Sequence, residues 1–163
     1  MSAPTQSATG QSAPLESWRP ILLYSVQEVF TIMVGAEVRV PDKTDPPLVT
    51  EVTGMVGLAG NICGVLSVRC GKSCATEIAS RMLGVPVAEA VSNLSDAVGE
   101  ICNMVAGNFK AKIDSLQDKC MLSVPTIIIG EDYQLYSLAA GDRIDLPFLF
   151  EGKSMWIGLE VRS

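Results

Sequence analysis

The chain has 163 residues, a net charge of −6 and 48% hydrophobic residues, a length that suits one folded core. Its Lys and Arg residues are scattered, which argues against nucleic-acid binding because nucleic-acid surfaces attract clustered basic side chains. The sequence contains no histidine. This absence excludes Ser-His-Asp and Cys-His nucleophilic chemistry and His-ligated zinc, so any chemistry must use carboxylates, amides, hydroxyls, thiols or lysines.

The sequence contains neither a membrane-spanning nor a secretory pattern. No uninterrupted apolar run approaches the ~18 to 20 residues that a bilayer requires. The segment 1–17 has no basic start and no apolar middle, as a secretory signal would have. The five cysteines are irregularly spaced and form no CxxC pair, which favours free thiols over a metal site or a redox site. We therefore expect a cytoplasmic protein without membrane insertion, bound metal or cofactor of its own.

The beginning of the chain differs in composition from the rest. Residues 1–16 are mainly Ser, Ala, Thr, Gln and Pro, and such a segment buries too little apolar surface to offset its ordering entropy. We expect a disordered tail at 1–16 and one domain at 17–163. A helix should start near Trp18 and end at Gly35, because apolar residues recur at helical spacing; they are Ile21, Leu22, Val26, Phe30 and Met33.

The order of the remaining elements predicts the fold class. The segment 37–40 alternates, and a proline-containing loop follows it. Further strands are expected at 49–58, 62–68, 120–124, 126–129, 143–150 and 155–161, and further helices at 72–83 and 92–113. Parallel βαβ alternation is not apparent in this order. The sequence therefore predicts an α+β fold with a mainly antiparallel sheet and helices packed on it.

The helix expected at 92–113 carries the polar residues of greatest interest. At about 100° per residue, its apolar side chains gather on one broad face, which should be buried. The opposite face carries Asp96, Gly99, Glu100, Asn103 and Gly107. The carboxylates and the amide are spaced i, i+4 and i+7, so they should lie in line along about 10 Å of helix.

Two glycines flank this polar pair. Gly99 and Gly107 each cost ~1 kcal/mol relative to alanine in an exposed helix. Such glycines are reasonable if another backbone or a bulky partner must approach the helix closely. The spacing of Glu100 and Asn103 alone also suits an ordinary solvated helix face, so it leaves both interpretations open.

Residues 95–108 resemble the signature helix of the CheC/CheX family of bacterial chemotaxis phosphatases. Asp96, Glu100, Asn103 and, further on, Pro125 stand where the family pattern has an Asp or Ser, a Glu, an Asn and a Pro. The segment 29–33 is also similar to the opening helix of CheX proteins. The first helix has Glu28 but no Asn three residues on, so the chain has one copy of the motif and is more similar to the CheX branch.

The resemblance implies a CheC-like fold and a phosphatase that removes the aspartyl phosphate from a CheY-type response regulator. It implies that Asn103 orients the attacking water and that Glu100 engages a receiver lysine. Gly99 and Gly107 are expected to contact the receiver, and Asp96 either contacts the receiver or caps a hydrogen bond. Mg²⁺ is expected on the receiver, and a homodimer is expected to form through the sheet. Two alternatives stay open: a receiver-binding module without significant turnover, and a subunit associated with the flagellar motor.

Overall fold

The structure is a computed structural model that describes residues 15–131, 133–135 and 141–162. Its helical elements are α1 (Leu15–Val29), the π-helical turn η1 (Phe30–Val34), α2 (Lys72–Leu83), α3 (Val87–Ala90), the 3₁₀ turn η2 (Val91–Asn93) and α4 (Leu94–Ala111). Its strands are β1 (Val52–Gly60), β2 (Cys63–Cys70), β3 (Cys120–Leu122), β4 (Thr126–Ile129), β5 (Asp142–Phe150) and β6 (Lys153–Arg162).

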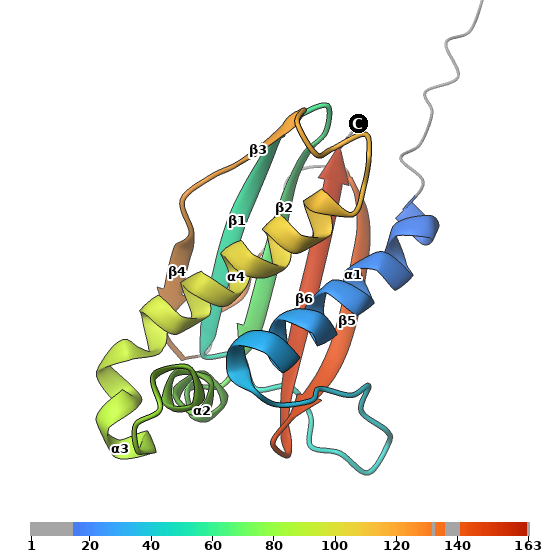
Figure 1. Ribbon diagram of the computed structural model, residues 1–163. Helices are drawn as coiled ribbons and strands as arrows, with labels where there is room; N and C mark the ends of the chain where they lie inside the picture. The colour runs from blue at the N-terminus through green and yellow to red at the C-terminus, as the bar shows by residue number, and fades with distance from the viewer. Residues whose placement is uncertain (1–14, 132, 136–140, 163) are drawn as a thin grey trace, which may run out of the picture.

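All six strands form one antiparallel sheet (Figure 1). The strand order is β3-β1-β2-β6-β5, and β4 also pairs with β1. Strand β3 pairs with the end of β1, whereas β4 pairs with its beginning, so both lie along the same side of β1. The predicted α+β class with a mainly antiparallel sheet is confirmed.

The helices α1 and α4 cross one face of this sheet, and α2 lies at the end of the sheet away from β3 (Figure 1). Alternate strand residues point toward the helices, as the twofold period of a strand requires. Their side chains form the fully buried centre of the core, which includes Val56, Leu66, Val68, Ile144, Phe148, Ile157 and Leu159. Trp18 of α1 packs edge-on against Phe109 of α4, with 5.8 Å between the ring centroids.

Two glycines follow the ends of helices, and Gly35 is the end that the sequence predicted. Gly35 follows η1 with φ 71°, and Gly84 follows α2 with φ 66°. In this left-handed conformation glycine is favoured because it has no Cβ. The backbone N–H of Gly84 donates to the carbonyl of Ser80 at 2.9 Å. The predicted bounds of α2, 72–83, are therefore confirmed. The helix α1 begins at Leu15, so the last two residues of the tail expected at 1–16 are helical, and the rest of that tail lies outside the described residues.

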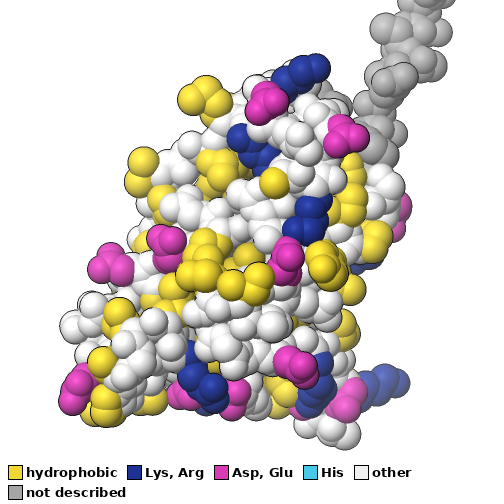
Figure 2. Space-filling view, in the orientation of Figure 1, with side chains coloured by type: hydrophobic (Ala, Val, Ile, Leu, Met, Phe, Trp, Pro, Cys, Tyr) yellow, Lys and Arg dark blue, Asp and Glu magenta, His cyan; other side chains and the backbone are white. Residues whose placement is uncertain are grey.

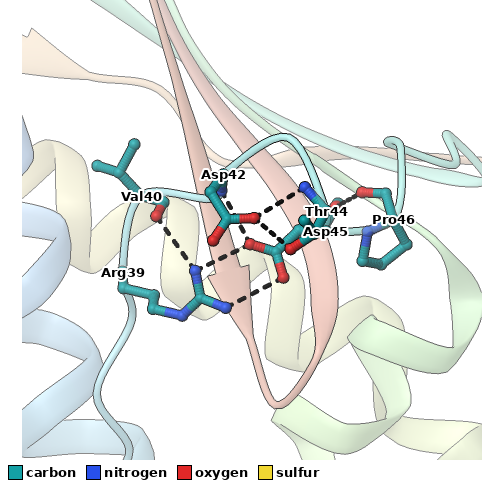
Figure 3. Close-up of polar contacts among 7 residues, drawn as sticks. Arg39, Val40, Asp42, Thr44, Asp45 and Pro46 are labelled. Carbon is teal, nitrogen blue, oxygen red and sulfur yellow. Dashed lines mark hydrogen bonds and ion pairs between the residues drawn. The ribbon is translucent and has the colours of Figure 1, made fainter.

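The segment 37–40 does not form the extended strand that its alternation suggested. It contributes one bridge, between Arg39 and Leu149, because the chain then turns away. Figure 3 shows the loop that follows, in which the guanidinium of Arg39 donates to both carboxylate oxygens of Asp45, at 2.9 and 3.0 Å. The backbone N–H of Thr44 donates to Asp42 within the same loop.

The strand expected at 120–124 ends at Leu122. The next residue, Ser123, still bonds to β1, because its N–H donates to the carbonyl of Gly57 at 2.9 Å and its Oγ accepts from the N–H of Gly57 at 2.8 Å. Val124 and Pro125 then interrupt the pairing before β4 begins. This interruption brings Pro125 toward α4.

All five cysteines are free thiols, as predicted. Cys63 is exposed, and the others are buried. Burial raises the pKa of the Cys102 thiol to about 12, so this side chain acts as a small apolar group. Within the described ranges, no helix is long and apolar enough to cross a bilayer.

Candidate functional site

The helix α4 holds the candidate site. Its buried face comprises Ala97, Val98, Ile101, Cys102, Val105 and Phe109, among others. On the other side, Asp96 and Glu100 are exposed and Asn103 is half-buried. The amphipathic pattern therefore folds as predicted, with the core on one side and the polar residues on the other.

Glu100 and Asn103 are one turn apart on the outward side of α4, as their spacing requires. Over the ranges that the structure covers, no hydrogen bond or ion pair joins either side chain to another side chain. Glu100 is exposed, and Asn103 beside it is half-buried.

Gly99 does not lie on the outward surface of α4, where its spacing suggested a contact with the receiver. It is buried, and a Cβ built on it would lie 3.5 Å from Cβ of Pro125 and 3.6 Å from Cδ1 of Ile127. The segment that packs closely against Gly99 is thus the entry to β4 in the same chain. The proposed contact of Gly99 with a receiver is corrected to an internal contact that seats Pro125 on the helix.

Gly107 has the open surroundings that Gly99 lacks. A Cβ built on it would meet no heavy atom within 4 Å, apart from its chain neighbours and the local helix backbone. Nothing in the described fold therefore requires glycine at this position. Gly107 lies seven residues after Glu100 and four after Asn103, so it continues the same outward line.

Gly54 of β1 is a positioning residue that the motif did not reveal. A Cβ on Gly54 would lie 2.6 Å from Sγ of Cys102 and 2.8 Å from Cγ1 of Val98. These distances are too short for real atoms, so α4 can lie this close to the sheet only over a glycine. A glycine inside a strand is the sequence signal for such a close approach.

A polar cluster ties the second half of α4 to α1. The carboxylate of Glu28 accepts hydrogen bonds from Nδ2 of Asn108 at 2.8 Å and from Nζ of Lys112 at 2.6 Å. These bonds lower the pKa of Glu28, with the bond from Lys112 contributing most. The Lys112 ammonium also lies 5.3 Å from the centre of the Tyr24 ring. Glu28 is thus engaged within the fold and does not form a second exposed motif.

A pocket of about 270 Å³ adjoins Glu100. It lies between the end of α2 and the beginning of α4, and its lining consists of Met82, Leu83, Asn93, Asp96, Ala97 and Glu100. On this side of the molecule, acidic side chains and apolar side chains lie next to one another (Figure 2). In the part of the chain that is described, no group of three or more His, Cys, Asp or Glu residues is arranged to hold a metal ion.

Comparison with known proteins agrees with this architecture. The fold is that of CheC-like proteins: a CheC-like superfamily protein from Shewanella sp. PV-4 has a TM-score of 0.75 at 24% identity, over 90% of this chain and 97% of that one. A chain in the CheX-CheY-BeF3-Mg²⁺ complex from Borrelia burgdorferi has a TM-score of 0.72 at 21% identity, over 90% and 98%.

The sequence comparison identifies the family. The model of the chemotaxis phosphatase CheX matches residues 52–149, and the chain belongs to this family. The matched region includes Gly54, Glu100, Asn103 and Gly107. The CheY-P phosphatase CheX of Thermotoga maritima is 27% identical over 150 residues, which cover 87% of this chain and 94% of that protein.

Proposed function

We propose that this protein hydrolyses the aspartyl phosphate of a CheY-type receiver. Membership of the CheX family supports this activity, and the Thermotoga relative carries the name CheY-P phosphatase. The single observation that carries the assignment to residues is the pair on the outward side of α4: Glu100 is exposed, Asn103 is half-buried, and neither bonds to another described side chain.

Asn103 would act by placing the attacking water. Phosphoryl transfer depends mainly on positioning and charge stabilisation, and a side-chain amide can orient water without acting as a base. The water oxygen forms a bond to phosphorus as the bond from phosphorus to the receiver's aspartyl oxygen breaks. Inorganic phosphate leaves, the receiver regains its carboxylate, and no covalent intermediate forms on this chain. The Mg²⁺ that supports the reaction would belong to the receiver.

The decisive experiment compares loss of phosphate from a phosphorylated receiver with and without this protein. Faster loss in its presence supports the phosphatase. A receiver-binding module would instead form a complex and leave the rate of phosphate loss unchanged. Binding to flagellar switch components in place of receivers would indicate a subunit of the motor.

Glu100 would dock the receiver by pairing with its lysine. Because this contact serves binding more than chemistry, we expect Glu100→Ala to raise KM for the phosphorylated receiver about tenfold with little change in kcat. Initial rates over a range of receiver concentrations measure both constants. Glu89→Ala is a matched control, since Glu89 is also exposed but lies on α3 and does not line the pocket. An unchanged KM, or a lowered melting temperature, would contradict the docking role.

Gly107 would leave room for the receiver. Gly107→Ala should stabilise the free protein by ~1 kcal/mol, because alanine is the better helix former and the added methyl group meets open space. The same methyl group should weaken receiver binding several-fold. Urea unfolding and titration with the receiver measure the two effects.

Gly99→Ala provides the comparison on the same helix, because its methyl group would face Pro125 and not the receiver. We expect Gly99→Ala to leave receiver affinity unchanged. Equal affinities for Gly107→Ala and the unmodified protein would show that no partner approaches Gly107 closely.

A cytoplasmic location and a homodimer formed through the sheet belong to the same proposal. The arrangement of β5 supports the dimer: among the described residues, β6 pairs along one side of β5, and the other side has only the bridge from Arg39 to Leu149. Strand edges of this kind readily pair with another chain. Sedimentation equilibrium would distinguish a dimer from a monomer.

A further inference from the structure

The pocket beside Glu100 has an apolar interior and a polar rim. Met82, Leu83 and Ala97 contribute its apolar surface, whereas Asp96 and Glu100 contribute carboxylates. Leu83 is the last residue of α2 and keeps 52% of its surface exposed. A large apolar side chain is therefore presented to solvent directly beside the proposed docking residue.

The size and position of this pocket suit a protein side chain better than a metabolite. Its volume of about 270 Å³ is below the ~300 to 1,000 Å³ typical of small-molecule sites. It also shares Glu100 with the surface proposed to meet the receiver, so a docked receiver would cover it. The thioether of Met82 can adjust its shape to an incoming side chain.

The charges around the pocket favour one kind of occupant. Two carboxylates and no Lys or Arg are among the lining residues. Such a rim complements a basic group and disfavours an acidic one. The surface of a partner that would match this pocket carries an apolar side chain with a basic residue next to it.

We propose that this pocket receives an apolar side chain of the receiver, adjacent to the lysine that Glu100 engages. This inference rests on the proposed phosphatase function and adds a determinant of receiver choice. Receivers with an apolar residue at the matching position bind, whereas receivers with an acidic residue there are rejected. Leu83 is then a specificity residue that takes no part in the chemistry.

The test is Leu83→Ser. We expect KM for the phosphorylated receiver to rise about tenfold, which corresponds to about 1.4 kcal/mol of lost binding, while kcat stays within twofold. Leu83→Met, which keeps an apolar side chain in the pocket lining, should have the same KM as the unmodified protein. The matched control is Met121→Ser on β3, at the opposite end of the sheet from α2 (Figure 1). Met121 is 78% exposed and lies outside the pocket, so the Met121→Ser variant should have the KM of the unmodified protein.

A second measurement identifies the occupant. Exposed apolar residues around the phosphorylation site of the receiver are changed to alanine one at a time and combined with Leu83→Ser. At one receiver position, the double change should raise KM by less than the product of the two separate increases, because both changes remove the same contact. Independent effects at every position would overturn the proposal.

The outcomes separate this inference from the function on which it rests. If the unmodified protein does not accelerate phosphate loss, the phosphatase proposal fails. If the unmodified protein is active and Asn103→Ala is not, but Leu83→Ser keeps the original KM, only the pocket proposal fails. Should Leu83→Ser unfold, Leu83→Ala replaces it in both measurements, and the same two results decide.

Discussion

Asn103→Ala is expected to lower kcat for receiver dephosphorylation about 100-fold while the receiver still binds. Asn103 is half-buried one turn from the exposed Glu100, and the loss of its amide removes the group that would hold the water in line with the phosphorus. A misplaced reactant of this kind costs about 10²-fold in rate. Single-turnover decay of the phosphorylated receiver at saturating enzyme gives the rate, and a binding titration with the same variant gives the affinity.

Asn108→Ala is the matched control. It makes the same chemical change on the same helix, but the Asn108 amide donates to Glu28 within the fold. We expect its kcat to stay within a few-fold of the unmodified protein. If Asn103→Ala and Asn108→Ala lose activity equally, the role given to Asn103 is wrong, because a general disturbance of α4 would explain both.

Gly54→Ala is expected to destabilise the fold by about 2 kcal/mol, as overpacking of a tight core does. Its new methyl group would lie 2.6 Å from Sγ of Cys102 and 2.8 Å from Cγ1 of Val98. The helix α4 must then move away from the sheet, and Glu100 and Asn103 move with it. Urea unfolding should show the loss of stability, and kcat/KM should fall even at temperatures where the variant is folded.

A rescue variant and a control make this test specific. Adding Cys102→Ala to Gly54→Ala removes the shorter of the two contacts and should recover part of the stability. Gly57→Ala lies in the same strand on the opposite face, where the new methyl group would be 3.3 Å from Oγ of Ser123. Its effect should be smaller. An unfolding midpoint for Gly54→Ala equal to that of the unmodified protein would contradict the packing argument.

Periodicity predicted the elements well because it is a local property of the chain. The bounds of α2 were predicted correctly, and α4 was predicted within two residues at each end. The outward position of Glu100 and Asn103 followed from the same pattern. Local patterns thus predicted which helix carries these two side chains and that they lie away from its core-facing side.

Features that depend on distant segments could not be predicted in this way. Gly99 was assigned to the outward stripe by its helical angle, but its burial depends on Pro125, which reaches it only because the pairing with β1 is interrupted after Ser123. The ion pair between Glu28 and Lys112 likewise joins α1 to the residue that directly follows α4. Sequence spacing within one helix carries no information on either contact.

Glu100, Asn103 and Gly107 lie on one unbroken helix, so their relative directions are fixed by the helical repeat. One residue inserted between Asn103 and Gly107 would rotate everything beyond it by about 100°. Gly107 would leave the outward line, and Asn108 would turn away from Glu28. Changes in chain length are therefore far more readily accommodated in the loop between η1 and β1 than anywhere within α4.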